Sequence, residues 1–105
     1  RYDRWYIMAE QNYQEAFEAP YLSGWCMMIR SEAFRRVGGF DERYFLYLED
    51  ADITRSLARE GRCVHLPVAS VVHGWGRGNY RNLGLMAVNL ISAFHYFRKW
   101  GWKFW

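Results

Sequence analysis

Apolar residues are distributed along this chain in unbroken runs that predict strands and in spaced positions that predict helices. Residues 21–29 form a short, nearly continuous apolar run, which is typical of a core strand buried on both faces. Residues 63–72 are rich in β-branched side chains but are interrupted by Pro67, so they predict one or two short strands. Residues 1–19 follow neither period and are interpreted as a loop or an irregular helix.

Three helices are predicted between and after these strands. Ser31 is expected to cap a short helix that runs to Val37, where two glycines stop it. A second helix is expected to start at or next to Asp50 and to end at Gly61. The third covers residues 79–100 and should pack on the rest of the domain or on a membrane face. Its apolar positions recur every three to four residues, at Leu83, Met86, Leu90, Phe94 and Phe97.

Length and charge restrict the class of protein. The chain has 105 residues, which suffices for one small domain or a part of one. Its formal net charge of +3 is spread over most of the chain, so nucleic-acid binding is not indicated. No apolar run approaches the roughly 18 residues that span a bilayer. The first residues show neither an initiator methionine nor a signal-peptide pattern, so we expect the chain to be cut from something longer.

The cysteines and the aromatic residues add two further expectations. Cys26 and Cys63 lie far apart in apolar segments, which predicts two buried free thiols and favours a cytoplasmic protein. Aromatic residues make up 20% of the chain, and the tail 96–105 interleaves them with cations. That combination suits the headgroup level of an anionic membrane. Alternatively, the same aromatic side chains cover a core or form a dimer contact.

The segment from Glu49 to Asp52 places three carboxylates in four positions at the start of the second helix. One interpretation is that Asp50 or Asp52 only caps the helix and complements its dipole. A second is that Asp50 acts as a general base on a sugar hydroxyl, because it presents an ionised oxygen at a helix start. A third takes Asp50 and Asp52 as a D-x-D motif that holds Mg²⁺ or Mn²⁺ against a diphosphate.

Four short motifs follow one another along the chain. They are Tyr21-Leu-Ser-Gly-Trp-Cys-Met-Met-Ile-Arg-Ser-Glu-Ala-Phe, Val37-Gly-Gly-Phe-Asp-Glu-Arg-Tyr-Phe, Leu48-Glu-Asp-Ala-Asp and Val71-Val-His-Gly. In this order and spacing they resemble the C-terminal part of family-2 glycosyltransferases, particularly rhamnosyltransferase-like enzymes of bacterial surface-polysaccharide assembly. The similarity runs from about Tyr21 to the end of the chain.

The resemblance implies an α/β fold, namely the C-terminal, acceptor-side half of a GT-A nucleotide-diphospho-sugar transferase. Residues 1–105 would be that part, and the N-terminal nucleotide-binding half would be absent. An inverting transfer of a sugar from a dTDP- or UDP-sugar to an acceptor hydroxyl is implied, in O-antigen- or capsule-like polysaccharide synthesis. Asp50 inherits the role of the catalytic base and Glu49 an acceptor contact, whereas Asp52 becomes a capping or structural residue.

The resemblance also implies a divalent metal, Mg²⁺ or Mn²⁺, bound mostly by the missing half. His73 matches a histidine that coordinates this cation in some relatives, and neutral imidazole is a suitable ligand. A histidine at a strand end is more often a hydrogen-bonded structural residue, and both interpretations stay open for His73. His65 and His95 match no motif and are interpreted as structural.

Other residues are candidates for contacts with substrate. Ser23 and Gly24 lie where relatives bring backbone close to donor and acceptor, although close strand packing explains a glycine equally well. Trp25 and Trp75 can stack on sugar rings, or they can be core residues. Arg77 and Arg81 lie beside a glycine-rich loop and can meet a diphosphate, although solvated arginines are commoner.

The sequence thus predicts a glycosyltransferase part that is inactive alone and that acts in the cytoplasm at the inner face of the cell membrane. Its expected partners are the nucleotide sugar and a saccharide acceptor, which in relatives is often lipid-linked. An unpaired sheet edge further predicts self-association, for example as a homodimer. The alternative function is a non-catalytic module that binds glycan or membrane and whose carboxylates only cap a helix.

Overall fold

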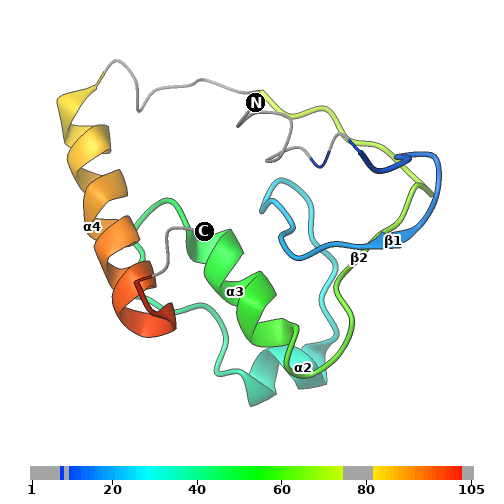
Figure 1. Ribbon diagram of the computed structural model, residues 1–105, viewed down its shortest axis with the longest axis horizontal. Coiled ribbons are helices and arrows are strands. Elements are labelled where there is room, and N and C mark those ends of the chain that lie inside the picture. Colours follow the sequence, from blue (N-terminus) through cyan, green and yellow to red (C-terminus); the bar gives the residue numbers. More distant parts are fainter. Residues whose placement is uncertain (1–7, 9, 75–81, 103–105) are drawn as a thin grey trace.

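The computed structural model describes residues 8, 10–74 and 82–102. In chain order its elements are β1 (Phe17–Glu18), α2 (Ser31–Arg36), α3 (Glu49–Leu57), β2 (Val64–His65) and α4 (Leu83–Trp100). Figure 1 shows α3 and α4 side by side, the β1–β2 ribbon on the opposite side of α3, and α2 near the end of α3. The described part is therefore a small α/β arrangement, as the sequence predicts.

The two strands form a short antiparallel ribbon in which Phe17 pairs with His65 and Glu18 with Val64. One more backbone hydrogen bond, from Ala19 N to Cys63 O at 2.9 Å, extends the pairing. The His65 ring stacks on Phe17 with centroids 4.8 Å apart. Its Nε2 lies 3.2 Å from the Tyr13 carbonyl oxygen, which can only accept. His65 therefore ties the N-terminal segment to the ribbon, in agreement with a structural role.

Helix α3 forms the centre of the packing. Three consecutive residues of this helix, Asp52, Ile53 and Thr54, are buried. Thr54 Oγ1 accepts from Leu22 N at 3.4 Å, and its single proton can go to Asp50 O at 2.7 Å or to Leu22 O at 3.3 Å. This threonine thus holds the segment around Leu22 against the helix.

The predicted core strand over residues 21–29 is wrong. These residues are coil, and none of them is buried. The physical reason is that the backbone groups of Leu22 and Gly24 bond to side chains of α3 and not to a neighbouring strand. Cys26 is accordingly exposed and not buried as predicted, whereas Cys63 is half-buried, and both thiols are free. Burial raises the pKa of the Cys63 thiol.

The predicted boundaries of the first two helices are partly confirmed. Asp50 is the second residue of α3, so its place at a helix N-terminus is confirmed, but the helix ends at Leu57 and not at Gly61. Ser31 is the first residue of α2 and not its cap, because Arg30 occupies the N-cap position without a side-chain hydrogen bond. The glycine stop is confirmed, since Gly38 has φ 83° and Gly39 has φ 73°, which favours glycine.

Helix α4 begins at Leu83, after Asn82, whose Oδ1 accepts from Gly84 N at 2.8 Å and from Leu85 N at 3.3 Å. Residues 79–81 of the predicted helix lie outside the described residues. Ser92 is the buried residue of α4, and its Oγ donates to Leu46 O at 2.6 Å. None of the described helices is both long and apolar enough to cross a membrane.

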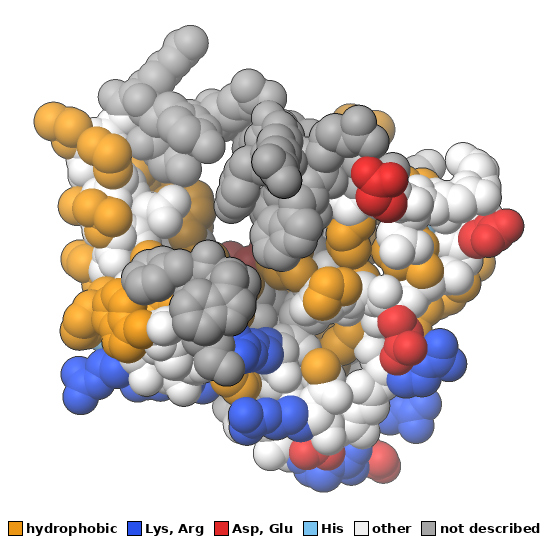
Figure 2. All heavy atoms as spheres, viewed as in Figure 1, with side chains coloured by type: hydrophobic (Ala, Val, Ile, Leu, Met, Phe, Trp, Pro, Cys, Tyr) orange, Lys and Arg blue, Asp and Glu red, His pale blue; other side chains and the backbone are white. Residues whose placement is uncertain are grey.

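The predicted apolar stripe of α4 faces outward along most of its length. Figure 2 shows hydrophobic side chains gathered over this helix, with Lys and Arg along the adjoining lower edge. The exposed apolar side chains of the helix are Leu83, Met86, Leu90, Ile91 and Phe94. The sequence predicts that this stripe packs on the rest of the domain or on a membrane face. The described residues of the domain cover little of it.

The C-terminal end of α4 is fastened to α3 through a buried carboxylate. Asp52, 3% exposed, accepts from Trp100 Nε1 at 2.7 Å and from Lys99 Nζ at 2.9 Å. The guanidinium carbons of Arg55, on α3, and of Arg59, in the turn after it, each lie 4.7 Å from the centroid of a Trp100 ring. Because a buried charge is costly unless it is paired, this contact fixes the relative position of the two helices.

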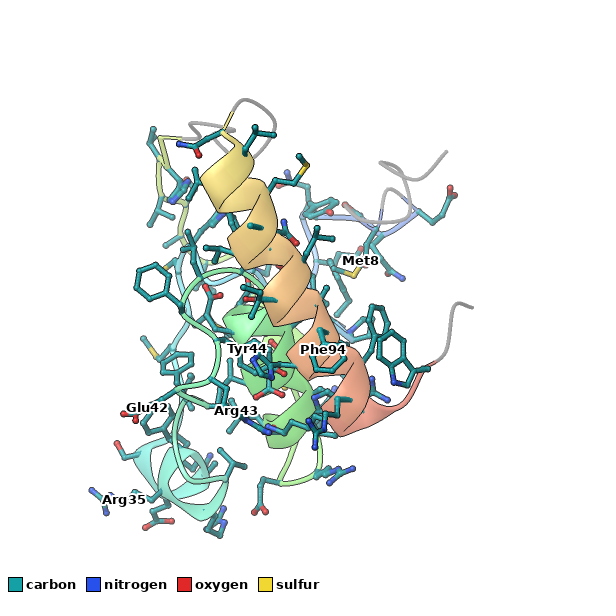
Figure 3. All side chains as sticks on the ribbon, turned by 90° about the vertical axis from the view of Figure 1, so that its left-hand side faces the viewer. Met8, Arg35, Glu42, Arg43, Tyr44 and Phe94 are labelled. Atoms are coloured by element: carbon teal, nitrogen blue, oxygen red, sulfur yellow. The ribbon has the colours of Figure 1, made fainter. Side chains whose placement is uncertain are left out.

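A second carboxylate joins the loop before α3 to the same lysine. Asp41 Oδ2 lies 2.6 Å from Arg43 Nη2 and 3.2 Å from Lys99 Nζ. Figure 3 shows Arg43 and Tyr44 on this loop beside α4. The hydrogen bonds from Arg43, helped by Lys99, hold the pKa of Asp41 well below its usual range. Burial and the neighbouring Asp52 carboxylate raise the pKa of Tyr44, which therefore keeps its proton.

Replacing Asp52 should weaken the contact between α3 and α4. In Asp52→Asn, the amide cannot accept from both Trp100 Nε1 and Lys99 Nζ as the carboxylate does. We expect the free energy of unfolding to fall by about 1–3 kcal/mol. Urea denaturation measures it, and Glu60→Gln is the control, because its exposed ion pair with Arg36 should contribute little. Equal stability of both variants would contradict the assigned role of Asp52.

The ion pairs of Asp41 should make stability depend on pH. Because the pKa of Asp41 is lower in the folded state, its stabilising effect is complete above the unfolded value of about 4. The effect is lost as pH falls from there toward the folded pKa. We therefore expect Asp41→Asn to lower the urea midpoint at pH 7, and the difference from the unsubstituted protein to shrink at pH 3 and below. A difference that stays constant with pH would contradict this assignment.

Candidate functional site

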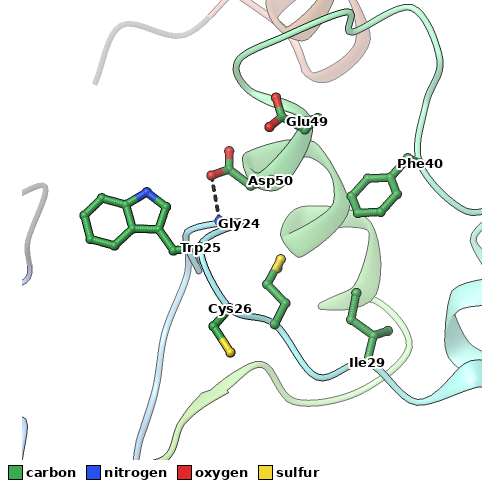
Figure 4. Close-up of a pocket in the computed structure, with 8 residues that line it drawn as sticks. Gly24, Trp25, Cys26, Ile29, Phe40, Glu49 and Asp50 are labelled. Carbon is green, nitrogen blue, oxygen red and sulfur yellow. Dashed lines mark hydrogen bonds between the residues drawn. The ribbon is translucent and has the colours of Figure 1, made fainter. Parts of the chain in front are cut away.

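An open pocket lies between the segment that follows Tyr21 and the N-terminal end of α3 (Figure 4). Its volume is about 400 Å³, which is sufficient for a small ligand or one part of a larger one. The lining is apolar apart from two adjacent carboxylates on α3. It consists of Gly24, Trp25, Cys26, Met27, Ile29, Phe40, Glu49 and Asp50.

Three hydrogen bonds orient the carboxylate of Asp50 at the edge of this pocket. Its Oδ2 accepts from Tyr21 OH at 2.8 Å and from Gly24 N at 2.9 Å. Its Oδ1 accepts from Ala51 N, the next residue of the helix, at 2.8 Å. In Figure 4 the second oxygen points away from Gly24, toward the side on which Glu49 lies. The side chain is thus held by protein donors while it still borders open space.

Gly24 makes this close approach possible. A Cβ atom added at Gly24 would lie 3.3 Å from Asp50 Cβ, which is tighter than an ordinary van der Waals contact. With a larger residue at this position, Asp50 or the backbone would have to shift by a few tenths of an ångström. The close neighbour of this glycine is therefore a helix side chain and not a strand, and its predicted approach to donor and acceptor stays a prediction.

Glu49 carries a polar atom without a partner. Its Oε2 is buried and accepts no hydrogen bond from the described residues. A buried carboxylate oxygen left in this state costs free energy, and such exceptions to hydrogen-bond satisfaction call for an explanation. Because Glu49 lines the pocket, a hydroxyl or amide of a bound molecule is one group that could satisfy this oxygen.

The backbone just before the two carboxylates is strained. Tyr47 has φ 69° and Leu48 has φ 65°, and both values fall in the left-handed region that favours glycine. Each such residue costs on the order of 1–3 kcal/mol and persists only where its surroundings hold it. Here Ser92 Oγ bonds Leu46 O, and Leu48 O accepts from Asp52 N at 2.9 Å. This turn sets the point at which α3 starts, and hence where Glu49 and Asp50 are presented.

The two aspartates of the D-x-D pattern point in different directions. Asp50 bonds to the segment at residues 21–24, whereas Asp52 bonds to α4. Residues two apart on a helix lie about 200° apart around its axis, so the divergence follows from helix geometry. Within the described ranges, no three His, Cys, Asp or Glu side chains converge as metal ligands. The paired-ligand interpretation of Asp50 and Asp52 is therefore not realised.

His73 is brought close to the pocket by a stacking contact. Its ring lies against Trp25, with centroids 4.7 Å apart and an interplanar angle of 3°. Trp25 lines the pocket. His73, a predicted metal ligand, and Trp25, predicted to stack on a sugar, therefore form one stacked pair. This contact is compatible with the structural interpretation of His73 and leaves the ligand role a prediction. His95, by contrast, is part of α4, and the centroid of its ring lies 6.4 Å from that of Tyr44.

Of the remaining candidate site residues, one lies within the described part of the chain and three lie outside it. Ser23 is half-buried next to Gly24. Trp75, Arg77 and Arg81 lie outside the described residues. Sequence reasoning missed Tyr21, whose hydroxyl bonds Asp50 across 29 positions of sequence. No local signal marks such a contact, because the residue reads as one more apolar position of a run.

Comparison with known proteins gives a partial match. No family model matches the chain, and no solved structure matches it significantly. The N-acetylglucosaminyl-diphospho-decaprenol L-rhamnosyltransferases of Mycobacterium tuberculosis strains CDC 1551 / Oshkosh and ATCC 25618 / H37Rv are each 44% identical over 72 residues, which cover 66% of this chain and 24% of the relative. Rhamnosyltransferase WbbL of Escherichia coli K12 is 34% identical over 65 residues, which cover 57% of this chain and 25% of the relative.

The chain thus spans roughly a quarter of the length of the curated relatives that it matches. These identities confirm the resemblance to rhamnosyltransferase-like glycosyltransferases that the sequence motifs indicate.

Enlarging Gly24 should displace Asp50. In Gly24→Ala, the new methyl group would crowd Asp50 Cβ and lengthen the bond from the residue-24 amide to Oδ2. We expect this amide to exchange with solvent about five- to tenfold faster, as the loss of one hydrogen bond predicts. Gly61→Ala is the matched control, since nothing lies within 4 Å of a Cβ at that position. Unchanged exchange in Gly24→Ala would mean that the contact does not hold Asp50.

Proposed function

We propose that this rhamnosyltransferase-like chain is the acceptor-side part of an inverting glycosyltransferase in which Asp50 deprotonates the acceptor hydroxyl. The observation that supports the proposal best is the position of Asp50. Its carboxylate borders an open pocket at a helix N-terminus and is oriented by three hydrogen bonds. General-base work requires a positioned carboxylate within reach of a substrate proton.

The acceptor sugar would lie in the pocket beside Asp50. Glu49 Oε2 offers a buried acceptor that has no partner within the described part of the chain, which suits a sugar hydroxyl. Trp25 adds an aromatic ring to the same lining and Gly24 adds backbone, while Ser23, the residue before Gly24, stays a predicted acceptor contact. A carboxylate beside an aromatic ring suits a carbohydrate. The carboxylate can accept hydrogen bonds from the sugar hydroxyls, and the aromatic ring can pack on the apolar face of the sugar.

The rest of the GT-A fold and the nucleotide-binding site would come from protein outside this chain. The support is the amount of uncovered apolar surface, since Met28 and Val72 are fully exposed and Phe45 is nearly so. The donor would be a dTDP- or UDP-sugar. The divalent metal would also be held mainly elsewhere, with His73 as a predicted ligand from this side, because the described residues provide no complete ligand set.

Contact with the cytoplasmic membrane face belongs to the same proposal. Helix α4 presents exposed apolar residues along its outer side and has no acidic residue, while Arg98 and Lys99 lie in its last turn. An apolar face with cations at one end suits an anionic interface, where a lipid-linked acceptor of polysaccharide synthesis would be found. We therefore propose that the tail 96–105 and the outer face of α4 contact the same membrane surface. Self-association stays a separate prediction.

The role of Asp50 is tested by Asp50→Asn in the protein that carries this chain. Asparagine keeps the shape of the side chain but cannot take up the proton, so kcat should fall by about 100-fold or more. Transfer is measured with dTDP-L-rhamnose and N-acetylglucosaminyl-diphospho-decaprenol, the acceptor that the mycobacterial relatives' name contains. Binding of dTDP, measured by calorimetry, should be unchanged.

The matched control is Glu32→Gln, which neutralises another carboxylate in the first turn of a helix but outside the pocket. It should transfer sugar like the unsubstituted protein. Turnover by Asp50→Asn at the unsubstituted rate would exclude the proposed base, and no transfer by the unsubstituted protein would exclude the proposed reaction.

A further inference from the structure

The hydrogen bonds of Asp50 are distributed unequally over its two oxygens. Among the described residues, Oδ2 receives two donors, the Tyr21 hydroxyl and the Gly24 amide, whereas Oδ1 receives only the amide of Ala51. An ionised carboxylate has about four lone-pair sites, two on each oxygen. Oδ2 is therefore saturated by protein donors, and Oδ1 keeps one site for another proton.

We infer that Tyr21 is a positioning residue, which with the Gly24 amide saturates Oδ2 and leaves Oδ1 as the atom that accepts the proton. The inference rests on the proposed role of Asp50 as the base and adds to it the choice of oxygen and the residue that enforces this choice. Tyr21 itself neither gains nor loses a proton in the reaction.

The Tyr21 hydroxyl is needed to orient Asp50 because rotation of an aspartate carboxyl group about its Cβ–Cγ bond is only weakly restricted. Rotation about the bond to the carboxyl group has broad, roughly two-fold preferences, so the side chain by itself does not select which oxygen faces the pocket. Two donors converging on Oδ2 from different residues make one orientation preferred. Without the Tyr21 hydroxyl, the amides of Gly24 and Ala51 would give one donor to each oxygen, so neither oxygen would be preferred as the proton acceptor.

The phenol is itself well placed. Tyr21 is half-buried, and the backbone of its neighbour Leu22 is in hydrogen-bonding contact with Thr54 Oγ1, one turn along α3 from Asp50. Asp50 and Thr54 lie four residues apart and therefore share a face of the helix. The segment at residues 21–24 thus lies along this face, with Tyr21 and Gly24 at Asp50 and Leu22 at Thr54.

The proton and electron balance of the step is simple. The acceptor O–H bond breaks, its proton goes to Asp50 Oδ1, and the oxygen's electron pair forms the new bond to the anomeric carbon of the donor. The bond between that carbon and the diphosphate oxygen breaks, and the nucleoside diphosphate leaves with the electron pair. Misplacing the base lowers the fraction of bound complexes that can react, so the loss should appear in kcat and not in binding.

The test is Tyr21→Phe, which removes one oxygen atom and keeps the ring. With dTDP-L-rhamnose and N-acetylglucosaminyl-diphospho-decaprenol as substrates, we expect kcat to fall about tenfold and both KM values to stay within twofold. The melting temperature should change by less than about 2 °C. Tyr13→Phe is the matched control, because it removes a hydroxyl outside the pocket and keeps the edge-to-face contacts of that ring with Phe17 and His65.

Each result separates this inference from the proposed function. Unchanged kcat in Tyr21→Phe together with an inactive Asp50→Asn would overturn the positioning role and leave Asp50 as the base. A lower kcat with a melting temperature lowered by more than about 5 °C, or with an equal rise in KM, would show a structural or binding role and also overturn it. An active Asp50→Asn would remove the proposed function, whatever Tyr21→Phe does.

Discussion

The arrangement depends above all on the hydrogen bonds that attach the segment at residues 21–24 to α3. Asp50 and Thr54, one turn apart, take up backbone groups of Leu22 and Gly24 that would otherwise need a neighbouring strand. The same bonds shape one wall of the pocket and fix the carboxylate that borders it. Stability and candidate chemistry therefore share one set of contacts, and Gly24 is the residue whose small size allows both.

The two aspartates of α3 have different roles because they point in different directions. Asp52 turns inward, where it is paired with Lys99 and hydrogen-bonded by Trp100, and these contacts hold α4 in place, whereas Asp50 turns toward the pocket. A structural carboxylate must be paired, because burial of an unpaired charge is costly. A base must keep a lone pair free, and the unequal hydrogen bonding of Asp50 meets that requirement. The strained turn at Tyr47 and Leu48 fixes where the helix that carries both begins.

Much apolar surface of the described residues is uncovered. The outer face of α4, together with Met28, Phe45 and Val72, is exposed to a degree that is unusual for a soluble domain of this size. Only a few side chains of the described residues are fully buried. They lie on α3 and at the contact between Ser92 and the loop before α3. Such surface is consistent with a part that is completed by other protein, as expected of a chain that spans roughly a quarter of its relatives.

The sequence by itself determined the local features: the start of a helix next to Asp50, the glycine stop after Val37, the long helix at the C-terminal end and the motifs that indicate the family. These depend on contacts within a few positions or on short strings of residues, so they can be read without a fold. Tertiary structure alone decided that residues 21–29 are not a strand, that Asp50 and Asp52 have different partners, that Trp25 stacks on His73 and that Tyr21 bonds Asp50. Each of those depends on groups more than twenty positions apart or on which neighbours cover a surface, and periodicity and composition carry no information about either.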